Sequence, residues 1–506
     1  MGHAKRVAKN TGILYLRMML TVFISLYATR IILEELGADN FGVYAVLASS
    51  VAIFGFLNGA VTSATQRFIA FGNLEKDIEK KKNTFSISMV LHIVMALLFV
   101  ILVEIISVFL FSSVLNLPES SILIAKKIIH FMILGQFFVI ITSPYLSVIM
   151  AHENMLVVAI IGIIESVLKL GIAYLIVYTV EDKLFLYGVS MSALTLILLL
   201  INALYCHVKY SEVTLRVIKY FNWKEMRKMT NFAGWSFLGI SSTMITSHGQ
   251  GIVLNVFFGT VVNAAYGIAS QVNGQLSVLA NVLLKALNPA ITKTEGSGDR
   301  KAMLKLSIMG SRISFYLLML VVIIALVEMP FIFNLWLKEV PEYVVIFCRL
   351  LLLRSLIEQM FIPLISTINA VGDIKSLNIQ FTILCLIPLP LSYLLFSLGY
   401  PAYAMYIIYV VYSVFFGVII IHQAKTKCKL DIKEFYSKVL LPCFLISIFC
   451  LLLASIPKIY FDESYNRLFM TIILSTVSSL SLIWFFGLQK NEKENISLTI
   501  KKLIKK

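Results

Sequence analysis

Long apolar runs dominate this sequence and restrict what it can fold into. A helix needs about 20 apolar residues to cross the hydrocarbon core of a bilayer. We count fourteen such segments, near 11–33, 41–66, 85–111, 128–150, 156–180, 184–206, 231–257, 264–290, 304–328, 343–371, 376–398, 401–422, 437–456 and 467–488. Only 14% of the 506 residues are charged, against roughly 25% in a typical soluble domain. The sequence therefore predicts an all-α polytopic membrane protein with about 14 transmembrane helices. It excludes a soluble enzyme, a disordered chain and a disulfide-rich scaffold.

The positive charges indicate how these spans are oriented. If the N-terminus is cytoplasmic, the cytoplasmic loops and tails contain thirty Lys and Arg residues. The outer loops contain six, which are Lys126, Lys127, Lys183, Lys338, Lys458 and Arg467. Such an excess on one side follows the positive-inside rule. We therefore expect both termini in the cytoplasm and attribute the net charge of +16 to topology and anionic lipid rather than to nucleic acid.

The loops divide the chain into five expected parts. Residues 1–206 form an N-lobe of six spans, and residues 207–230 form a cytoplasmic connector rich in Lys and Arg. Residues 231–424 form a C-lobe of six spans, residues 425–490 hold spans 13 and 14, and residues 491–506 form a basic tail. Within the connector, 213–229 has an amphipathic pattern, which predicts a helix on the membrane surface.

The second half of the chain repeats features of the first half at an offset of 222 residues. Leu36-Gly37 aligns with Phe258-Gly259, and the segment 41–46 aligns with 263–268, where each copy has a Gly or Ala close to a Tyr. The matching spans keep the same orientation because an even number of spans separates them. Parallel repeats of this kind are typical of transporters whose two lobes surround a central cavity.

The cysteines and the first apolar run give no sign of other chemistry. The six Cys residues form no CxxC motif and no Cys/His cluster, so we expect no metal site and no redox site. The first apolar run is too long for a signal-peptide core and has no cleavage site of small residues, which predicts a retained span.

Several charged residues fall inside the predicted spans, where an isolated charge costs about 2.5–3.5 kcal/mol. Glu165 and Lys169 are four residues apart on span 5, so they can form a helical ion pair. Arg354 and Glu358 have the same spacing on span 10. Both pairs are either structural or candidates for gating or coupling. His248 lies in a polar, glycine-flanked stretch and is a further candidate for a proton-linked role.

Three cations near the cytoplasmic side of their spans have no acid at helical spacing. Arg17, Lys285 and Arg312 each lie six to eight residues into a span, which is roughly 9–12 Å from the cytoplasmic side. Lys285 shares span 8 with a polar stripe. The stripe residues are Gln271, Gln275, Asn281 and Asn288, and a matching stripe on span 2 consists of Asn58, Thr62, Thr65 and Gln66. These cations either extend to the cytoplasmic surface or line a wet cavity. The second interpretation predicts an anionic substrate, best a phosphate or diphosphate group. The predicted substrate-binding residues are Arg17, Lys285, Arg312, Asn58, Gln66, Gln271, Gln275 and Asn281.

The first hairpin resembles a known family. Arg30-Ile31-Ile32-Leu33, Leu36-Gly37, Phe41-Gly42-Val43-Tyr44, Gly59 and Arg67 resemble the first hairpin of Wzx-type polysaccharide flippases. These belong to the multidrug/oligosaccharidyl-lipid/polysaccharide exporter superfamily. The later pattern Ala265-Tyr266-Gly267 with Pro289 resembles the second-lobe counterpart. Fourteen spans divided as six, six and two also match this family.

The resemblance implies a function and a set of partners. It implies alternating access in a bacterial cytoplasmic (inner) membrane, with a cationic central cavity. The cavity would take the pyrophosphate-sugar head of an undecaprenyl-linked oligosaccharide, as used for O-antigen or capsule. The resemblance further implies a monomer that works beside a polysaccharide polymerase and chain-length proteins. It implies coupling to an H⁺ or Na⁺ gradient, without another cofactor.

Other functions remain open at this stage. A lipid II flippase of the same superfamily is one, although its denser first-span Arg-Asp cluster is absent here because Met18 follows Arg17. A multidrug or cation antiporter is another, although cation export favours acids in the cavity. A membrane glycosyltransferase or polymerase would need acids or His in a sizeable outer loop, and the outer loops here are short, so we expect a non-enzyme. Spans 13 and 14 either face lipid or form a groove for an isoprenoid tail.

Overall fold

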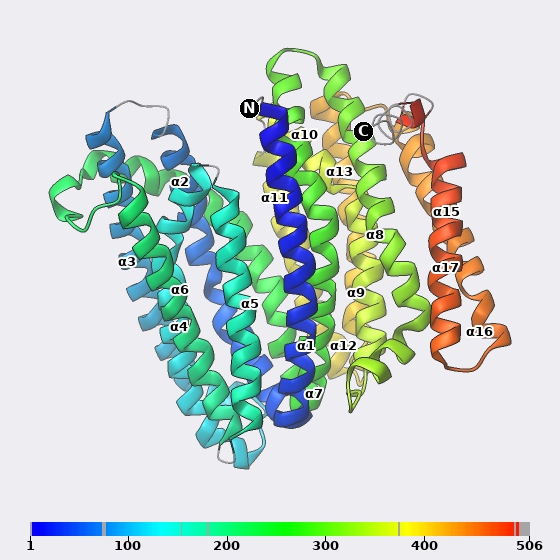
Figure 1. Ribbon diagram of the computed structural model, residues 1–506, viewed down its shortest axis with the longest axis horizontal. Helices are drawn as coiled ribbons and strands as arrows, with labels where there is room; N and C mark the ends of the chain where they lie inside the picture. Colours follow the sequence, from blue (N-terminus) through cyan, green and yellow to red (C-terminus); the bar gives the residue numbers. More distant parts are fainter. Residues whose placement is uncertain are drawn as a thin grey trace. The chain divides into compact units, whose positions relative to one another are not determined.

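The protein is helical throughout the part that the structure describes. The computed structural model describes residues 3–72, 77–152, 154–179, 182–372, 375–489 and 492–494, and these contain helices and no strand (Figure 1). This confirms the predicted all-α class.

The helices follow one another with short connections. The first half contains α1 (His3–Ala52), η1 (Ile53–Gly55), α2 (Phe56–Gly72), α3 (Ile78–Phe109), η2 (Leu110–Val114), α4 (Glu119–Ala151), α5 (Met155–Val177), α6 (Lys183–Lys209), η3 (Ile218–Tyr220) and α7 (Trp223–Gly296). The second half contains α8 (Arg300–Trp336), α9 (Val344–Gln359), α10 (Ile362–Val371), α11 (Lys375–Leu386), α12 (Pro388–Ser397), α13 (Ala404–Cys428), α14 (Ile432–Phe435), η4 (Tyr436–Leu440), α15 (Leu441–Ala454), α16 (Ile456–Tyr460), α17 (Tyr465–Leu482) and η5 (Ile483–Gly487).

Eleven described helical stretches are long and apolar enough to cross a membrane. One of them covers 48 residues, Met19–Gln66. A straight helix of that length would measure roughly 72 Å, more than twice the roughly 30 Å of a bilayer core. The chain instead bends at Gly37, whose φ of 72° lies in the left-handed region that favours glycine. Helix α7 bends in the same way at Gly259, where φ is 75°.

These bends account for most of the difference between eleven stretches and fourteen predicted spans. Gly37 separates predicted spans 1 and 2, and Gly259 separates spans 7 and 8. Predicted span 10 is broken into α9 and α10, each shorter than a full span. The two glycines are the residues paired by the 222-residue offset, so the sequence repeat corresponds to a repeated backbone bend.

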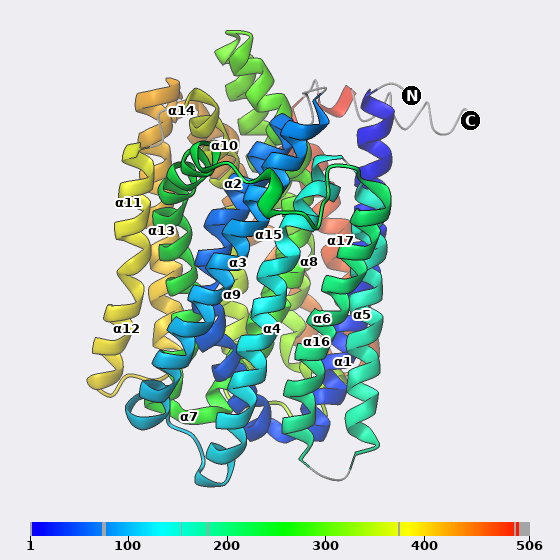
Figure 2. The same ribbon diagram turned by 90° about the vertical axis from the view of Figure 1, so that its left-hand side faces the viewer.

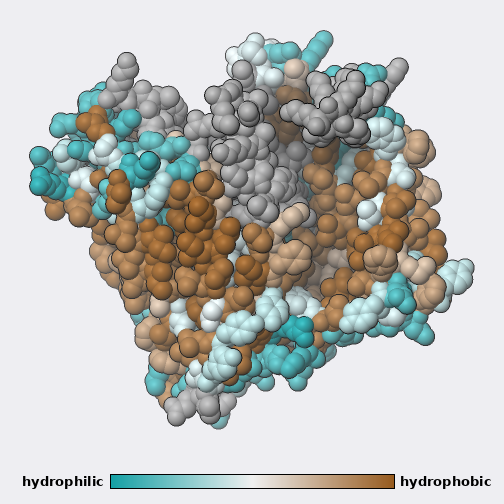
Figure 3. Space-filling model, viewed as in Figure 1, coloured by the Kyte–Doolittle hydropathy of each residue, from teal (hydrophilic) through white to brown (hydrophobic). Residues whose placement is uncertain are grey.

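The surface of the helices suits a membrane. On the face drawn in Figure 3, apolar side chains cover the middle of the helices and hydrophilic side chains gather at their ends. Large apolar side chains are well exposed, including Phe23, Val108, Phe444 and Phe485. Exposed apolar surface on this scale is rare in a soluble monomer. We therefore describe the chain as a multi-pass membrane protein.

The connector differs from the prediction. A continuous amphipathic helix over 213–229 was expected, and this expectation is wrong. The chain instead makes turns after Tyr210, forms the single 3₁₀ turn η3, and enters α7 at Trp223. Leu215, Ile218 and Trp223 are 81%, 89% and 68% exposed, whereas Val213 and Met229 are buried, so the apolar residues of the pattern do not share one face of a single helix.

The chain divides into two compact units, which we call unit 1 and unit 2. Unit 1 comprises residues 1–268, 337–344 and 381–405, and unit 2 comprises residues 269–336, 345–380 and 406–506. In unit 1, α4 packs against α3 and α6, and α1 packs against α5 (Figures 1 and 2). In unit 2, α8 packs against α10, α15 and α17. All six cysteines are free and buried, with no disulfide between them.

Candidate functional site

The polar stripe on α2 faces a cavity inside unit 1. The cavity has a volume of about 700 Å³ and is bounded by α2, α4, α5 and α6. Its polar lining residues are Asn58, Thr62, Gln66, Thr142, Ser143, Glu165, Thr195 and Asn202. Asn58, Gln66 and Glu165 were predicted site residues, and the structure brings these three together. We call this space the unit 1 cavity.

Asn58 is the centre of a hydrogen-bonded group in the wall of the unit 1 cavity. The hydroxyls of Thr62 and Ser143 both donate to Asn58 Oδ1, each at 3.0 Å. Thr62 Oγ1 also lies 3.3 Å from His92 Nε2, and the ring Nδ1 of His92 is 2.7 Å from the carbonyl oxygen of Ser88. Because Asn58 Oδ1 already accepts two hydrogen bonds, the remaining hydrogen-bonding capacity of Asn58 lies in the two N–H groups of its side-chain amide.

The opposite side of the unit 1 cavity is formed by α5 and α6. Lys169 Nζ donates to Glu165 Oε1 at 2.6 Å, which confirms the predicted helical ion pair. Asn202 is 3% exposed; its Nδ2 donates to the carbonyl of Leu198, and its Oδ1 has no hydrogen-bond partner in the described part of the chain. The cavity therefore offers amide and hydroxyl groups around a carboxylate whose charge is balanced.

A second predicted pair lies in unit 2. Arg354 Nε donates to Glu358 Oε1 at 2.7 Å. The guanidinium carbon of Arg354 is also 4.8 Å from the ring centre of Tyr409 and 5.4 Å from that of Tyr412, both on α13. Cation–π contacts of this kind stabilise a cation that is removed from water. The break between α9 and α10 begins just after this pair, at Met360.

Arg312 has a partner that was not predicted. Its Nη2 donates to Glu492 Oε1 at 2.6 Å, and its Nη1 donates to the carbonyl oxygen of Gly487 at 3.0 Å. The expectation that Arg312 is an unpaired cation is therefore wrong. The reason is that Glu492 lies 180 residues further along the chain, so no local helical spacing could reveal it.

The other predicted site residues are placed only in part. The side chains of Arg17, Asn281 and Lys285 lie outside the described residues, although α1 and α7 run through these positions. Gln271, Gln275 and His248 are half-buried on α7. Arg17, Asn58, Gln66 and His248 belong to unit 1, whereas Gln271, Gln275, Asn281, Lys285 and Arg312 belong to unit 2.

Acidic residues before and after the Gly37 bend make contacts that sequence reasoning missed. Glu34 forms an ion pair with Lys338, and Glu35 accepts a hydrogen bond from Lys183 Nζ at 2.5 Å. Asp39 Oδ1 accepts a hydrogen bond from Thr260 at 3.0 Å. The available signal was that the first outer loop carries only acids while other outer loops carry isolated lysines.

A buried ion pair between α8 and α17 was also missed. Glu328 is fully buried, and Arg467 Nη2 donates to its Oε2 at 2.7 Å. Thr471 donates to the other carboxylate oxygen at 2.9 Å. Arg467 was predicted to lie in an outer loop, yet it lies in the first turn of α17 with only 5% of its side chain exposed. Among the described residues, no group of three or more His, Cys, Asp or Glu could hold a metal ion.

Comparison with known proteins identifies the fold. No protein-family model matches the sequence, and no curated protein matches it either. Solved structures do match: the chain has the fold of transporters of the MOP superfamily. The lipid II flippase MurJ, in an inward closed conformation, matches with a TM-score of 0.69 and 14% identity, over 95% of this chain and 98% of the flippase.

Two further structures share the fold over a smaller part of the chain. A MATE transporter solved in complex with MaL6 matches with a TM-score of 0.60 and 14% identity, over 84% of this chain and 96% of the transporter. A MOP superfamily transporter from Pyrococcus furiosus, described as having a binding pocket of reverse polarity, matches with a TM-score of 0.57 and 15% identity, over 84% of this chain and 96% of that protein.

Proposed function

We propose that this protein is a flippase for a lipid-linked oligosaccharide. It would move undecaprenyl-pyrophosphate-linked oligosaccharide from the inner to the outer leaflet of a bacterial cytoplasmic membrane by alternating access. The observation that carries this proposal is the fold likeness to a lipid flippase along nearly the whole chain, 95% of it.

The extent of the match favours a lipid substrate over a drug. The MATE structures cover 84% of this chain, so roughly a sixth of it has no counterpart in them. The flippase match leaves only a twentieth uncovered. A long isoprenoid tail needs apolar surface beside the polar path, and α15 and α17 expose large apolar residues such as Phe444, Phe449 and Phe469.

The chemistry of the unit 1 cavity supports a sugar head group. Sugars present many hydroxyls, each of which both donates and accepts a hydrogen bond, and amides and hydroxyls match this pattern. Asn58, Thr195 and Asn202 supply such groups. Glu165 is already neutralised by Lys169, so the cavity offers no isolated carboxylate to attract a drug cation.

The pyrophosphate requires cations, and we propose Arg17 and Lys285 for this role. Both lie inside apolar helices without an acid at helical spacing. Arg312 is left out of this set because it is paired with Glu492. The Arg354–Glu358 pair, placed before the break between α9 and α10, is our proposed gate, because a broken helix in a transporter can rearrange around its gap. We propose an H⁺ or Na⁺ gradient as the energy source.

Depletion of the protein in its own host tests this function. Lipid-linked glycans would be extracted, and the membrane face that they occupy would be determined. We expect complete oligosaccharide on undecaprenyl pyrophosphate to accumulate at the inner face, together with loss of surface polymer. Normal surface polymer without a trapped intermediate, in a host without a redundant flippase, would exclude the proposal. Accumulation of lipid II instead would identify a lipid II flippase.

Single substitutions then test the proposed ligands. Lys285→Ala and Asn58→Leu, supplied to the depleted host, should fail to restore surface polymer while the protein still reaches the membrane. Lys209→Ala is the matched control, because Lys209 ends α6 with an exposed side chain. Full restoration by Lys285→Ala would remove Lys285 from the pyrophosphate site.

A further inference from the structure

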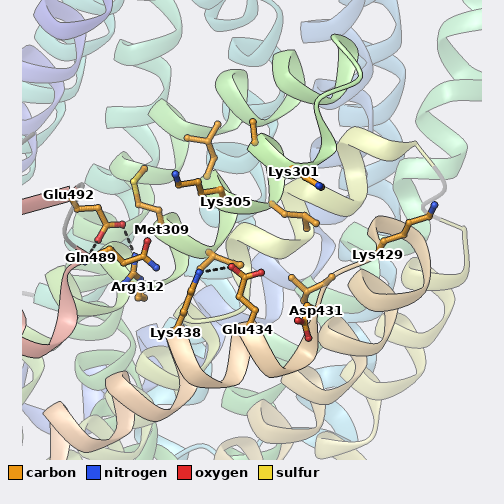
Figure 4. A pocket seen from close by; sticks show the side chains of 15 residues that line it. Lys301, Lys305, Met309, Arg312, Lys429, Asp431, Glu434, Lys438, Gln489 and Glu492 are labelled. Atoms are coloured by element: carbon orange, nitrogen blue, oxygen red, sulfur yellow. Dashed lines mark hydrogen bonds and ion pairs between the residues drawn. The ribbon is translucent and has the colours of Figure 1, made fainter.

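Unit 2 contains a second pocket, separate from the residues proposed above for transport. It has a volume of about 840 Å³, within the usual size range for small-molecule sites. Figure 4 shows its walls: Lys301 and Lys305 come from α8, Lys429 and Asp431 come from the loop after α13, and Glu434 and Lys438 come from α14 and η4. Arg312, Gln489 and Glu492 line the remaining side. We call this space the lysine pocket.

The charges in the lysine pocket do not cancel. Arg312 is paired with Glu492, and Lys438 is paired with Glu434 at 2.6 Å. The third acid, Asp431, uses its carboxylate to accept the backbone N–H of Lys433 at the start of α14. No ion pair joins the three other cations of the pocket to an acid in the described part of the chain; these are Lys301, Lys305 and Lys429. The lining therefore carries a net charge of +2, with five cations against three acids, which favours an anion.

One further feature points to a ligand. It lies across the pocket from Lys429, whose φ of 61° is the left-handed conformation that commonly ends a helix, here directly after α13. Arg312 is 4% exposed, and its Nε has no hydrogen-bond partner among the described residues. A buried donor without a partner costs free energy, which a polar ligand at this pocket would recover.

The position of the lysine pocket indicates what kind of anion it takes. The pocket begins at the first turns of α8, where the apolar span Arg300–Trp336 starts, and it includes Leu304, Ile308 and Met309. Beside it, Tyr436 is 54% exposed and Phe444 is 64% exposed. A charged rim next to exposed apolar helix suits a molecule with an anionic head and an apolar tail.

We propose that the lysine pocket binds the phosphate head group of an anionic membrane lipid. Lysines bind phosphate as point charges, and basic pockets between transmembrane helices bind anionic lipid heads on the cytoplasmic side. The lipid tail lies along the exposed apolar face of η4 and α15. This proposal does not depend on the proposed flippase activity, because it concerns a lipid that stays bound rather than one that is moved.

Equilibrium binding to the purified full-length protein tests the proposal. The protein in detergent is titrated with phosphatidylglycerol, and retained lipid is counted by native mass spectrometry. Phosphatidylcholine, inorganic pyrophosphate and undecaprenyl phosphate are the comparison probes. We expect phosphatidylglycerol to bind the wild type about a hundredfold more tightly than the Lys301→Gln/Lys305→Gln/Lys429→Gln variant, since each lysine near a membrane surface contributes on the order of 1 kcal/mol.

The control variant carries the same change in charge elsewhere. It is Lys209→Gln/Lys425→Gln/Lys433→Gln, in which three exposed lysines outside the pocket are neutralised. An equal loss of binding in this control would overturn the proposal, as would equal binding of phosphatidylcholine to the wild type. Displacement by inorganic pyrophosphate alone would assign the pocket to a soluble phosphate compound. Exclusive binding of undecaprenyl phosphate would assign it to the isoprenoid carrier.

A folding defect in the triple variant would not end the test. The single variant Lys429→Gln keeps the left-handed turn occupied by a polar residue and removes one charge. Its affinity for phosphatidylglycerol should fall about fivefold, again at about 1 kcal/mol per lysine. Unchanged affinity and unchanged salt dependence in this variant would overturn the proposal. Because no transport is measured, a negative result here leaves the flippase proposal standing.

Discussion

At the scale of single residues, the carboxylate of Glu328 is a buried charge that depends on its hydrogen-bond partners. It is fully buried, and it accepts hydrogen bonds from Arg467 and Thr471. Arg467 Nε lies 3.2 Å from both carboxylate oxygens, in addition to the contact made by Nη2. The multiple contacts offset the cost of removing both charges from water. Removal of either partner from such a pair destabilises the fold, because the other charge stays buried without a partner.

We therefore expect Glu328→Ala or Arg467→Ala to lower the free energy of unfolding by about 3–5 kcal/mol, because each leaves a buried charge without its partner. Thermal unfolding of the purified protein in detergent measures this. The double variant Glu328→Leu/Arg467→Met should be more stable than either single variant, since it leaves no buried charge.

Lys228→Gln is the control for this series. Lys228 and Glu225 form an exposed pair at 2.7 Å, and exposed pairs contribute about 0–1 kcal/mol. If the single variants at 328 and 467 unfold at the same temperature as Lys228→Gln, the buried pair contributes no more to stability than the exposed pair, and the prediction is wrong.

Which ion pairs could be predicted depends on the distance between partners along the chain. Glu165 with Lys169 and Arg354 with Glu358 follow from the turn of one helix, and the structure has both. The partner of Arg312 is 180 residues away. For all three pairs, the sequence shows a charged residue inside an apolar helix. When the partner is distant along the chain, only tertiary packing determines which residue forms the ion pair.

At the scale of helices, the two repeated bends meet each other in unit 1. The two hairpins that they create come so close at Gly42 that a Cβ built there would overlap the carbonyl oxygen of Thr260. Asp39 and Thr260 are hydrogen-bonded beside this contact. Because Thr260 contributes backbone rather than a flexible side chain, the contact cannot adjust easily to a larger residue.

Gly42→Ala should accordingly destabilise the protein by about 1–3 kcal/mol, the usual cost of overpacking. Gly171→Ala is the matched control, because a Cβ at Gly171 in α5 meets nothing within 4 Å. That change should be neutral or stabilise by up to about 1 kcal/mol through helix propensity. Thermal unfolding compares the two variants, and equal melting temperatures would contradict the close contact.

The element boundaries show where sequence patterns were sufficient. Apolar length located the helices, and the offset of 222 residues paired Gly37 with Gly259, both of which have positive φ. The pattern failed where an interruption is short: span 10 looked continuous, but it breaks near Met360 and resumes with Pro363 in the first turn of α10. It also failed over 213–229, because helical periodicity cannot distinguish one helix from consecutive turns.

At the scale of the whole molecule, topology decides which groups face which compartment. We expect an alkaline phosphatase fused after Lys183 to be active in the host, and a green fluorescent protein fused after Lys209 to fluoresce. The reason is the excess of positive charge in the predicted cytoplasmic loops and tails taken together, thirty Lys and Arg against six in the outer loops. The opposite pattern of reporter signals would invert the orientation and move the lysine pocket to the outer face.

The burial of all six cysteines has a practical consequence for anyone who wishes to watch this protein work. Each thiol is shielded from reagents in solution, so a membrane-impermeant maleimide should leave the native protein unlabelled. A single cysteine introduced in a loop would then report alone, without prior removal of residues such as Cys385, whose Sγ contacts Thr246 in the core. The natural sequence can therefore be used directly for cysteine-labelling experiments. Such experiments would show, loop by loop, which compartment each segment faces during a transport cycle.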